Sequence, residues 1–333
     1  MEDIYGLNRS FNFISSGSTL INCVLGGGFP QGRISNVISG AGIGKSLMAL
    51  ETCANFSHQY PEGEFSYIEA ESAFDEEYAA NIGLDIHKVK LVRDISTLEA
   101  LRDYLLSEMK DRDPETPGLC VVDSLDSLSD EKADENFIGD KGNYGTKAKF
   151  LSEFLKFFDN KLETTNTHLF IISQIRDNLG AGLYGNPYRV AGGKALEFYC
   201  SQRIWLYSDE KIEKTFGGEK RIVGNWIKIK CIKNRLGPPH RECFVPIYYR
   251  FGIDNLGANL SYLFGAKVME SFEGMSSSNF MAKIWKLLSS EKTEDHKLYR
   301  QYDKEVTKMT LNHWKEVEQH LSTKFSKYSK DDV

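Results

Sequence analysis

The chain has 333 residues, of which 41% are hydrophobic and 26% are charged, a composition that argues against disorder and allows one large domain plus a smaller one. The net charge is −6 and the isoelectric point is about 5.8, which exclude a general electrostatic attraction to nucleic acid or to an anionic membrane. Any contact with DNA must therefore come from a local basic surface.

The six cysteines are scattered, without Cys-x-x-Cys spacing, and several lie inside apolar stretches. This pattern predicts buried free thiols in a reducing compartment rather than a disulfide or zinc framework. The first residues lack the basic start and apolar core of a signal peptide, and no apolar run approaches the roughly 18 residues of a membrane span. We therefore expect a cytoplasmic protein with no membrane partner.

Short apolar strands alternate with longer helices over the first half of the chain. A short N-terminal arm, an apolar segment at 20–25 and a glycine-rich turn at 26–32 lead into a first strand. Further strands are expected at 65–69, 89–92, 119–123 and 168–173, and helices at 47–56, 72–78, 98–109 and 147–162. Such alternation is typical of βαβ units on a parallel sheet.

The second half of the chain has a different pattern. Strands are expected at 203–207, 226–233 and 243–249 with hardly any helix between them, which predicts an antiparallel or hairpin-linked extension of the sheet. From about Lys267, helices at 280–288 and 310–325 and a serine-rich linker at 276–278 predict a small helical domain. The expected fold is therefore α/β, with an arm at 1–12, a core at 13–266 and a helical C-terminal domain at 267–333.

A phosphate-binding loop is predicted where the first strand ends. Glycines at 40, 42 and 44 allow open backbone conformations that turn N–H groups inward, and the following helix adds its positive N-terminus. In this pattern the lysine contacts the β and γ phosphates, and the serine hydroxyl binds Mg²⁺. An ordinary glycine-rich turn is the alternative, and Ser39 stands where the strict pattern has glycine. The predicted nucleotide-binding residues are Gly40, Ala41, Gly42, Ile43, Gly44, Lys45 and Ser46.

Acidic side chains follow two other predicted strands. Asp123 ends an apolar strand, where a carboxylate completes Mg²⁺ binding directly or through water. Glu69 and Glu71 lie at the end of the strand between, where ligands bind in open parallel sheets. Glu71 is the better candidate for orienting the attacking water because a helix starts just after it. Either glutamate could instead be a solvated cap or an ion-pair partner.

A neutral amide, Gln174, ends the strand at 168–173 beside the same site. It can bond the γ-phosphate and so report whether that phosphate is present. It opens a long segment at 175–190 that is rich in Gly and Asn. Loops of this length inside a compact domain are usually functional or disordered.

These motifs, in this order, resemble the RecA recombinases of bacteria and their phage relatives. The resemblance runs from about Phe13 to Gly265 and is most specific around the long segment. The matching stretches are Ser16-Gly17-Ser18, the phosphate loop, Ala70-Glu71-x-Ala73-x-Asp75-x-x-Tyr78, Val121-Val122-Asp123-Ser124, Ile138-Gly139-Asp140, Gln174-Ile175-Arg176, Gly185-Asn186-Pro187, Gly192-Gly193-x-Ala195-Leu196-x-Phe198-Tyr199 and Lys233-Asn234-Arg235.

The resemblance implies a RecA-like P-loop ATPase core and a role for each matching position. Glu71 would be the general base, and Gln174 would link the γ-phosphate to the DNA loop. Asp75 and Tyr78 would bind the adenine. Lys233 and Arg235 would reach the ATP of a neighbouring subunit, and Phe198 would pass the nucleotide state across that interface.

The resemblance also implies two DNA-binding loops. The first would span 139–145, with Tyr144 near the bases, and the helix after it would present polar side chains to phosphate. In the second loop, Arg176 and a glycine pair would contact the backbone and Leu179 would wedge between base triplets. The expected DNA-binding residues are Tyr144, Gly145, Ser152, Lys156, Arg176, Asn178, Leu179, Gly180, Gly192 and Gly193.

The implied function is an ATP-dependent and Mg²⁺-dependent recombinase. It would form a homo-oligomeric helical filament on single-stranded DNA, pair it with homologous duplex DNA, and hydrolyse ATP in response to DNA. A loader or a single-strand-binding protein is a further expected partner. The alternatives are a RecA-fold mediator or paralogue without strand exchange, and a ring-forming helicase-type motor. The intact catalytic set argues against an inactive paralogue, and the few residues before the core argue against a helicase.

Three features depart from the family pattern. Ser39 replaces the first glycine of the phosphate loop, and Asp177-Asn178 stands where the family often has an apolar-basic pair. The N-terminal arm is too short for the family's packing helix. The segment after Lys267 shows no match.

Overall fold

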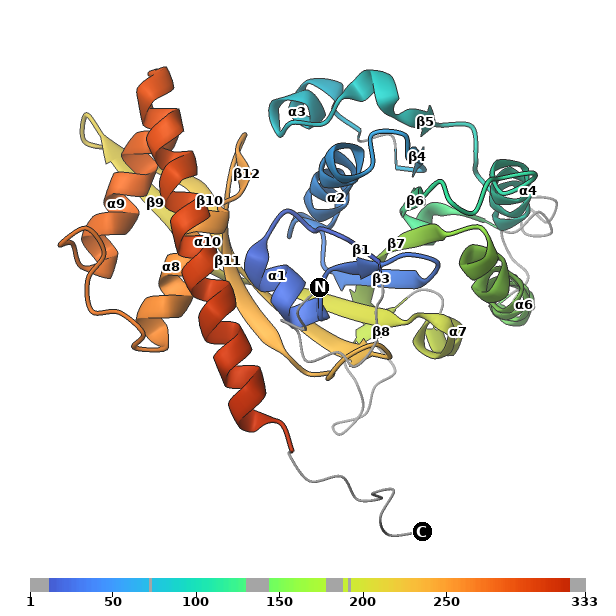
Figure 1. Ribbon diagram of the computed structural model, residues 1–333. Coiled ribbons are helices and arrows are strands. Elements are labelled where there is room, and N and C mark those ends of the chain that lie inside the picture. Colours follow the sequence, from blue (N-terminus) through green and yellow to red (C-terminus); the bar gives the residue numbers. More distant parts are fainter. Residues whose placement is uncertain (1–11, 72–73, 130–143, 178–187, 191–192, 324–333) are drawn as a thin grey trace, which may run out of the picture. The chain divides into compact units, whose positions relative to one another are not determined.

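The computed structural model describes residues 12–71, 74–129, 144–177, 188–190 and 193–323 (Figure 1). It divides into two compact units, one that ends at Asp254 and one that begins at Asn255. The division falls before the predicted boundary at 266/267 because the helix that starts at Asn255 packs with the helices that follow it.

One large sheet forms the centre of the first unit, in the order β12-β11-β10-β9-β3-β7-β6-β4-β5. The six strands from β9 to β5 in this order are parallel, and the remaining strands are antiparallel. The predicted α/β fold with an antiparallel extension is therefore confirmed. The parallel strands before β9 are β3 (Ile34–Ser39), β4 (Glu64–Glu69), β5 (Lys90–Val92), β6 (Gly118–Asp123) and β7 (Thr167–Asp177).

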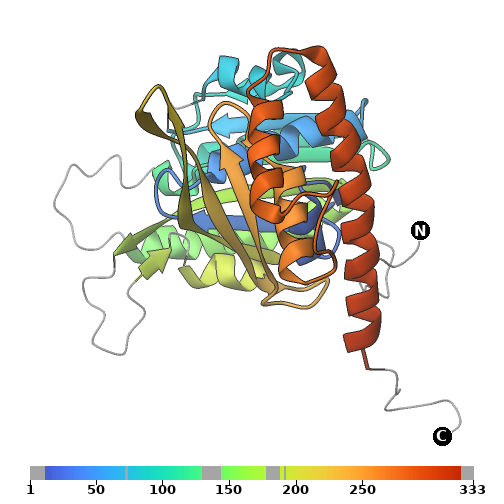
Figure 2. The same ribbon diagram turned by 90° about the vertical axis from the view of Figure 1, so that its left-hand side faces the viewer.

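The antiparallel part is larger than the sequence indicated. β9 spans Gln202–Phe216 and β10 spans Glu219–Asn234, and the two form a long ribbon that is visible in Figure 2. The halves of the two strands that lie next to their connecting turn carry mostly polar residues. Apolar runs therefore mark only the other halves. The edge is completed by β11 (Glu242–Tyr248) and β12 (Gly252–Ile253), while β1 (Phe13–Ile14) and β2 (Phe29–Pro30) form a separate small sheet.

Helices cover both faces of the parallel strands. α2 (Lys45–Gln59) lies on one face, and α4 (Leu98–Glu108) and α6 (Tyr144–Thr164) lie on the other (Figure 1). The shorter helices are α1 (Thr19–Leu25), α3 (Glu76–Asn81), α7 (Gly193–Tyr199) and the 3-10 turns η1 (Ile86–Lys88) and η2 (Leu125–Ser127). The predicted helices at 47–56, 98–109 and 147–162 are thus confirmed, each within a few residues.

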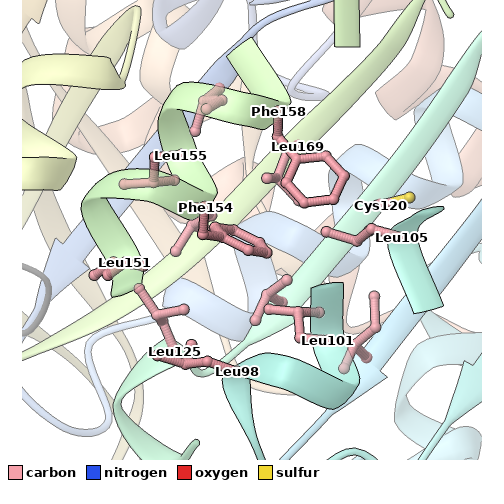
Figure 3. Packing of buried hydrophobic residues seen from close by; sticks show 14 of the residues in the cluster. Leu98, Leu101, Leu105, Cys120, Leu125, Leu151, Phe154, Leu155, Phe158 and Leu169 are labelled. Atoms are coloured by element: carbon pink, nitrogen blue, oxygen red, sulfur yellow. The ribbon is translucent and has the colours of Figure 1, made fainter. Parts of the chain in front are cut away.

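Strand alternation sorts the core into two layers. On β6, Cys120 and Val122 face α4 and α6, whereas Val121 between them faces the α2 side. Figure 3 shows how leucines of α4 meet Phe154 and Phe158 of α6 over this face. Burial of these apolar side chains holds the strand ends, and hence the polar residues that follow them, in fixed positions.

The predicted burial of unpaired cysteines is confirmed, because all six are buried and free. Within the residues that the structure describes, no helix combines the length and apolar character needed to cross a membrane. The cysteines are Cys23, Cys53, Cys120, Cys200, Cys231 and Cys243.

The second unit is helical, as predicted, with α8 (Asn255–Gly265), α9 (Ser277–Leu288) and α10 (Thr293–Leu321). Two boundaries were predicted wrongly. The serines at 276–278 start α9 instead of forming a linker, which suits the preference of serine for helix N-termini. α10 begins at Thr293 and not at 310, because its first turns are largely charged and only widely spaced residues such as Tyr302 and Val306 are buried.

Candidate functional site

The glycine-rich loop between β3 and α2 has the backbone geometry of a phosphate cradle. Gly42 and Gly44 have φ angles of 70° and 113°, in the left-handed region that glycine adopts most easily. Gly44 is the N-cap of α2, so the free N–H groups of the first helical turn lie beside the loop. Gly40, unlike the prediction, keeps an ordinary φ.

Lys45 lies folded against the loop. Its Nζ donates to the carbonyl of Gly40 at 2.8 Å and, more weakly, to the carbonyl and hydroxyl oxygens of Ser39 at 3.4 and 3.3 Å. Ser39 Oγ itself donates to the Gly40 carbonyl at 2.7 Å, so the serine is accommodated at the glycine position with its hydroxyl paired. Burial lowers the pKa of Lys45, whereas the carboxylates of Asp123 and Glu71 raise it.

Asp123 lies at the end of β6 with only 7% of its surface exposed. Tyr67, from the adjacent strand β4, donates its hydroxyl to Asp123 Oδ2 at 2.6 Å. Burial raises the pKa of Asp123, and hydrogen bonds from Tyr67 and Ser46 oppose this rise. Ser46 and Asp123 are therefore close enough to share an ion.

The two candidate glutamates have different surroundings. Glu69 is buried, and Oε2 lies 3.7 Å from Arg93 Nε. Glu71 is exposed, and its Oε1 accepts from the hydroxyl of Ser124 and from Gln174 Nε2 at 2.9 Å. The geometry thus brings Glu71, and not Glu69, together with the side-chain amide of Gln174 on β7.

A cavity of about 210 Å³ opens beside the loop. It brings together residues from α2, β4, β6 and the start of α3, including the metal, base and adenine candidates. Asp75 caps α3 by accepting from the backbone N–H of Tyr78 at 2.9 Å. The lining residues are Ser46, Leu47, Leu50, Tyr67, Glu69, Glu71, Phe74, Asp75, Tyr78 and Asp123.

These features fit ATP and Mg²⁺. The first turn of α2 has free N–H groups beside the loop, and the hydrogen-bond partners of the Lys45 ammonium are neutral oxygens of its own loop, which a phosphate could replace. A hydroxyl and a buried carboxylate, from Ser46 and Asp123, are hard oxygen ligands of the kind that Mg²⁺ prefers.

Lys233 and Arg235 lie away from this loop. Lys233 lies near the end of β10, and Arg235 follows that strand. Both donate to the carbonyl oxygen of Phe198 near the end of α7, and Lys233 Nζ lies 2.8 Å from it. The Arg235 guanidinium also lies 5.8 Å from the centre of the Phe198 ring, whose residue is 63% exposed. The three predicted interface residues therefore form one exposed cluster.

The sheet register places this cluster at the end of β3 opposite to the loop. The N–H of Arg235 bonds to Ser201, and the N–H of Ser201 bonds to Ile34, the first residue of β3. The phosphate loop follows Ser39, the last residue of that strand. A six-residue strand spans roughly 17–20 Å, so these side chains point to a different place from their own chain's loop.

Comparisons with known proteins identify the family. The RecA N-terminal domain family matches residues 5–254. The RecA protein of Macrococcus caseolyticus is 32% identical over 277 residues, which cover 80% of this chain and 74% of that protein. The RecA protein of Limosilactobacillus reuteri is 34% identical, with 73% and 64% covered, and that of Sulfurovum sp. is 36% identical, with 75% and 69% covered.

The chain belongs to the RecA family. It aligns with 64–74% of the length of these RecA proteins, and the family match ends where the helical unit begins. Among solved structures, the RadB recombinase has the same fold, with a TM-score of 0.52 at 20% identity over 72% of this chain and 98% of that one.

The RecA-family DNA positions fall partly on described residues. Tyr144 and Gly145 are the first residues of α6, and the rest of the expected first loop lies outside the described residues. Ser152 and Lys156 are four residues apart on α6, and so share a face on which both are accessible.

The sequence predicted a loop over the whole segment after Gln174, but part of this segment is strand. β7 continues to Asp177 and pairs with β8 (Tyr188–Val190) in an antiparallel hairpin, with Arg176 opposite Arg189. Gly193 opens α7 with a φ of 46°. Asn178, Leu179, Gly180 and Gly192 lie outside the described residues.

Sequence reasoning missed three residues of the site. Tyr67 could have been found, because it lies two residues before Glu69 and so shares the face on which Asp123 lies. Phe74, which packs edge-on against Tyr67 at 5.0 Å between ring centres, gave no such signal. Asp126 was missed because its partner comes from another strand: it accepts from the backbone N–H of Gln174 at 2.7 Å.

Proposed function

We propose that the chain is an ATP-dependent recombinase that forms a helical filament on single-stranded DNA and exchanges strands with homologous duplex DNA. The observation that carries this proposal is the 2.9 Å hydrogen bond between Gln174 Nε2 and Glu71 Oε1. It joins the candidate base to β7, the strand that leads into the expected second DNA-binding loop at 175–190. ATP chemistry and DNA binding would therefore share one contact.

In the proposed reaction, Lys45 and the loop N–H groups bind the phosphates, and Ser46 and Asp123 hold Mg²⁺. The bound ion neutralises phosphate charge. Glu71 accepts the proton of the attacking water, and Gln174 exchanges its bond to Glu71 for one to the γ-phosphate. This exchange releases the base and lets the Gln174 side chain report the γ-phosphate to the segment that follows β7.

The Lys233–Arg235 cluster supports assembly. Because it lies toward the end of β3 opposite to the phosphate loop, we infer that its cations act on the ATP of a neighbouring subunit rather than on their own. Single-stranded DNA would hold neighbours together and so complete each site. Hydrolysis would then depend on DNA.

A recombination mediator that binds ATP without strand exchange is the second candidate. Asp177 and Asn178 favour it, because an acidic residue at the start of the DNA segment weakens attraction to phosphate. A loader or single-strand-binding protein would be a partner in either case.

The test combines ATP hydrolysis, with and without single-stranded DNA, and electron microscopy of the same samples. We expect slow hydrolysis by the protein alone, strong stimulation by DNA, and long helical filaments. Filaments without strand exchange in a duplex-pairing assay would favour the mediator. Rings, or full hydrolysis without DNA, would contradict the proposal.

A further inference from the structure

The backbone of Gln174, three residues before the end of β7, is held by a side chain where the neighbouring strand β6 has stopped pairing. β6 pairs with β7 only as far as Val122 opposite Ile171, whereas β3 remains paired up to Ser39 opposite Gln174. On the β6 side, therefore, the ladder has ended before Gln174. The carboxylate of Asp126 accepts the Gln174 backbone N–H at 2.7 Å and takes the place of a strand there.

The same short turn, η2, also holds Glu71. Ser127 Oγ lies 3.3 Å from Glu71 Oε1 and 3.2 Å from Ser124 Oγ, and Ser124 bonds the same carboxylate oxygen. The turn thus anchors both partners of the Glu71–Gln174 contact. The Asp126 carboxylate holds Gln174, and the serine hydroxyls hold Glu71. A charge-assisted bond such as that of Asp126 is stronger than a neutral one.

We propose that Asp126 is a positioning residue that fixes the backbone of Gln174, so that the Gln174 side chain can move between Glu71 and the γ-phosphate while its main chain stays still. Without this anchor, the strand end moves with the side chain, and the presence of the γ-phosphate is no longer transmitted to the segment that follows. This inference deepens the proposed function and rests on it for the role of the γ-phosphate.

The first measurement does not depend on DNA. Amide hydrogen exchange at Gln174 is followed in wild type, Asp126→Ala and Asp126→Asn. Alanine removes the acceptor, so exchange should be about tenfold faster, whereas asparagine keeps a carbonyl oxygen and should keep most of the protection. Asp103→Ala is the matched control, because Asp103 is an exposed carboxylate on α4 that pairs only locally with Arg102. Unchanged exchange in Asp126→Ala would overturn the proposal.

The second measurement is the ratio of single-stranded DNA affinities in a non-hydrolysable ATP analogue and in ADP. Asp126→Ala should reduce this ratio toward that of Gln174→Ala while still binding both nucleotides, and Asp126→Asn should restore it. A merely structural residue would lower both affinities together. If Asp126→Ala does not fold, Asp126→Ser replaces it, since its oxygen lies one bond closer to the backbone.

The two arms separate the claims. A wild-type ratio near one contradicts the proposed function, and the exchange measurement then still decides whether Asp126 anchors Gln174. A large wild-type ratio that Asp126→Ala preserves overturns the positioning role alone.

Discussion

Ser39 and Lys45 show how a single substitution fits into a phosphate loop. The serine hydroxyl faces inward, where it donates to the Gly40 carbonyl and lies 3.3 Å from the lysine ammonium. A glycine at this position would offer the ammonium only backbone carbonyls. The Ser39 side chain therefore adds an oxygen to the resting site of Lys45.

Glu71 is the residue on which hydrolysis depends in this account. Glu71→Gln keeps the size of the side chain and an oxygen that can accept from Ser124 and Gln174, but the amide is a far weaker base. We expect ATP and DNA binding within a few-fold of wild type and hydrolysis at least about 100-fold slower. Single-turnover kinetics and nucleotide titration measure the two effects separately. Normal hydrolysis would move the assignment to another residue.

Tyr67 should control the pH range over which Asp123 can bind Mg²⁺. Burial already raises the pKa of Asp123, and Tyr67→Phe removes a hydrogen bond that lowers it. The carboxylate should then be protonated at a higher pH, so Mg²⁺ affinity should fall more at pH 5 than at pH 8. Tyr249→Phe, at an exposed tyrosine, is the control. Equal losses at both pH values would indicate a packing defect instead.

At the residue scale, the local sequence predicted the functional groups that lie at or shortly after the end of a single strand. Lys45, Asp123 and Glu71 each follow an apolar strand, and parallel strands deliver their carboxyl ends to one edge. The contacts of Asp126 could not be predicted, because they depend on the point at which a neighbouring strand stops pairing.

At the element scale, α2 is attached to the last strand of the core by one carboxyl group. Glu51 Oε1 accepts from the backbone N–H of Ile253 at 2.7 Å, and burial raises the pKa of Glu51 to about 7. Because the pKa in the folded state lies above the ordinary value of 4.5, this group makes folding less favourable as the pH rises from 4.5 to about 7.

Glu51→Gln should remove this pH dependence while keeping an acceptor for Ile253. The free energy of unfolding of the variant, relative to wild type, should therefore increase from pH 5 to pH 8, by a few kcal/mol at most, since one pKa unit corresponds to about 1.4 kcal/mol. Urea unfolding at the two pH values measures it. A stability difference between variant and wild type that is the same at both pH values would contradict the prediction. Glu62→Gln, at an exposed glutamate, is the control and should show no change of this difference with pH.

Gly224 allows β10 to pair closely with β11. A Cβ at this position would lie 2.1 Å from the carbonyl oxygen of Ile247, a backbone atom that cannot move aside cheaply. Gly224→Ala should lower the free energy of unfolding by more than about 2 kcal/mol. Gly265→Ala, where a Cβ would meet nothing within 4 Å, is the matched control. Equal stability of the two variants would contradict this reading of the sheet.

The elements that the sequence predicted well are those with continuous apolar runs. β6 and β7 lie in the middle of the sheet, and their apolar residues pack on both faces. The outer part of the β9–β10 ribbon and the first turns of α10 bury few side chains, so no apolar period marked them. The β7–β8 hairpin was missed because its pairing joins residues on either side of a long segment.

At the scale of the whole molecule, the account requires more than one copy. The nucleotide loop and the cluster of Lys233 and Arg235 lie toward opposite ends of β3, and each is suited to phosphate. Repetition of one heterologous contact generates an open helix when the rotation does not close. The helical unit that begins at Asn255 lies outside the family match.

The most direct test of a site shared between subunits mixes two inactive variants. Glu71→Gln lacks the base but keeps Arg235, whereas Arg235→Ala keeps the base but lacks the arginine. Each alone should show little DNA-stimulated ATP hydrolysis, and an equal mixture on single-stranded DNA should recover roughly a quarter of the wild-type rate, because a quarter of random contacts pair the two intact halves. A mixture that stays at the level of the separate variants, although both still bind DNA, would contradict the account.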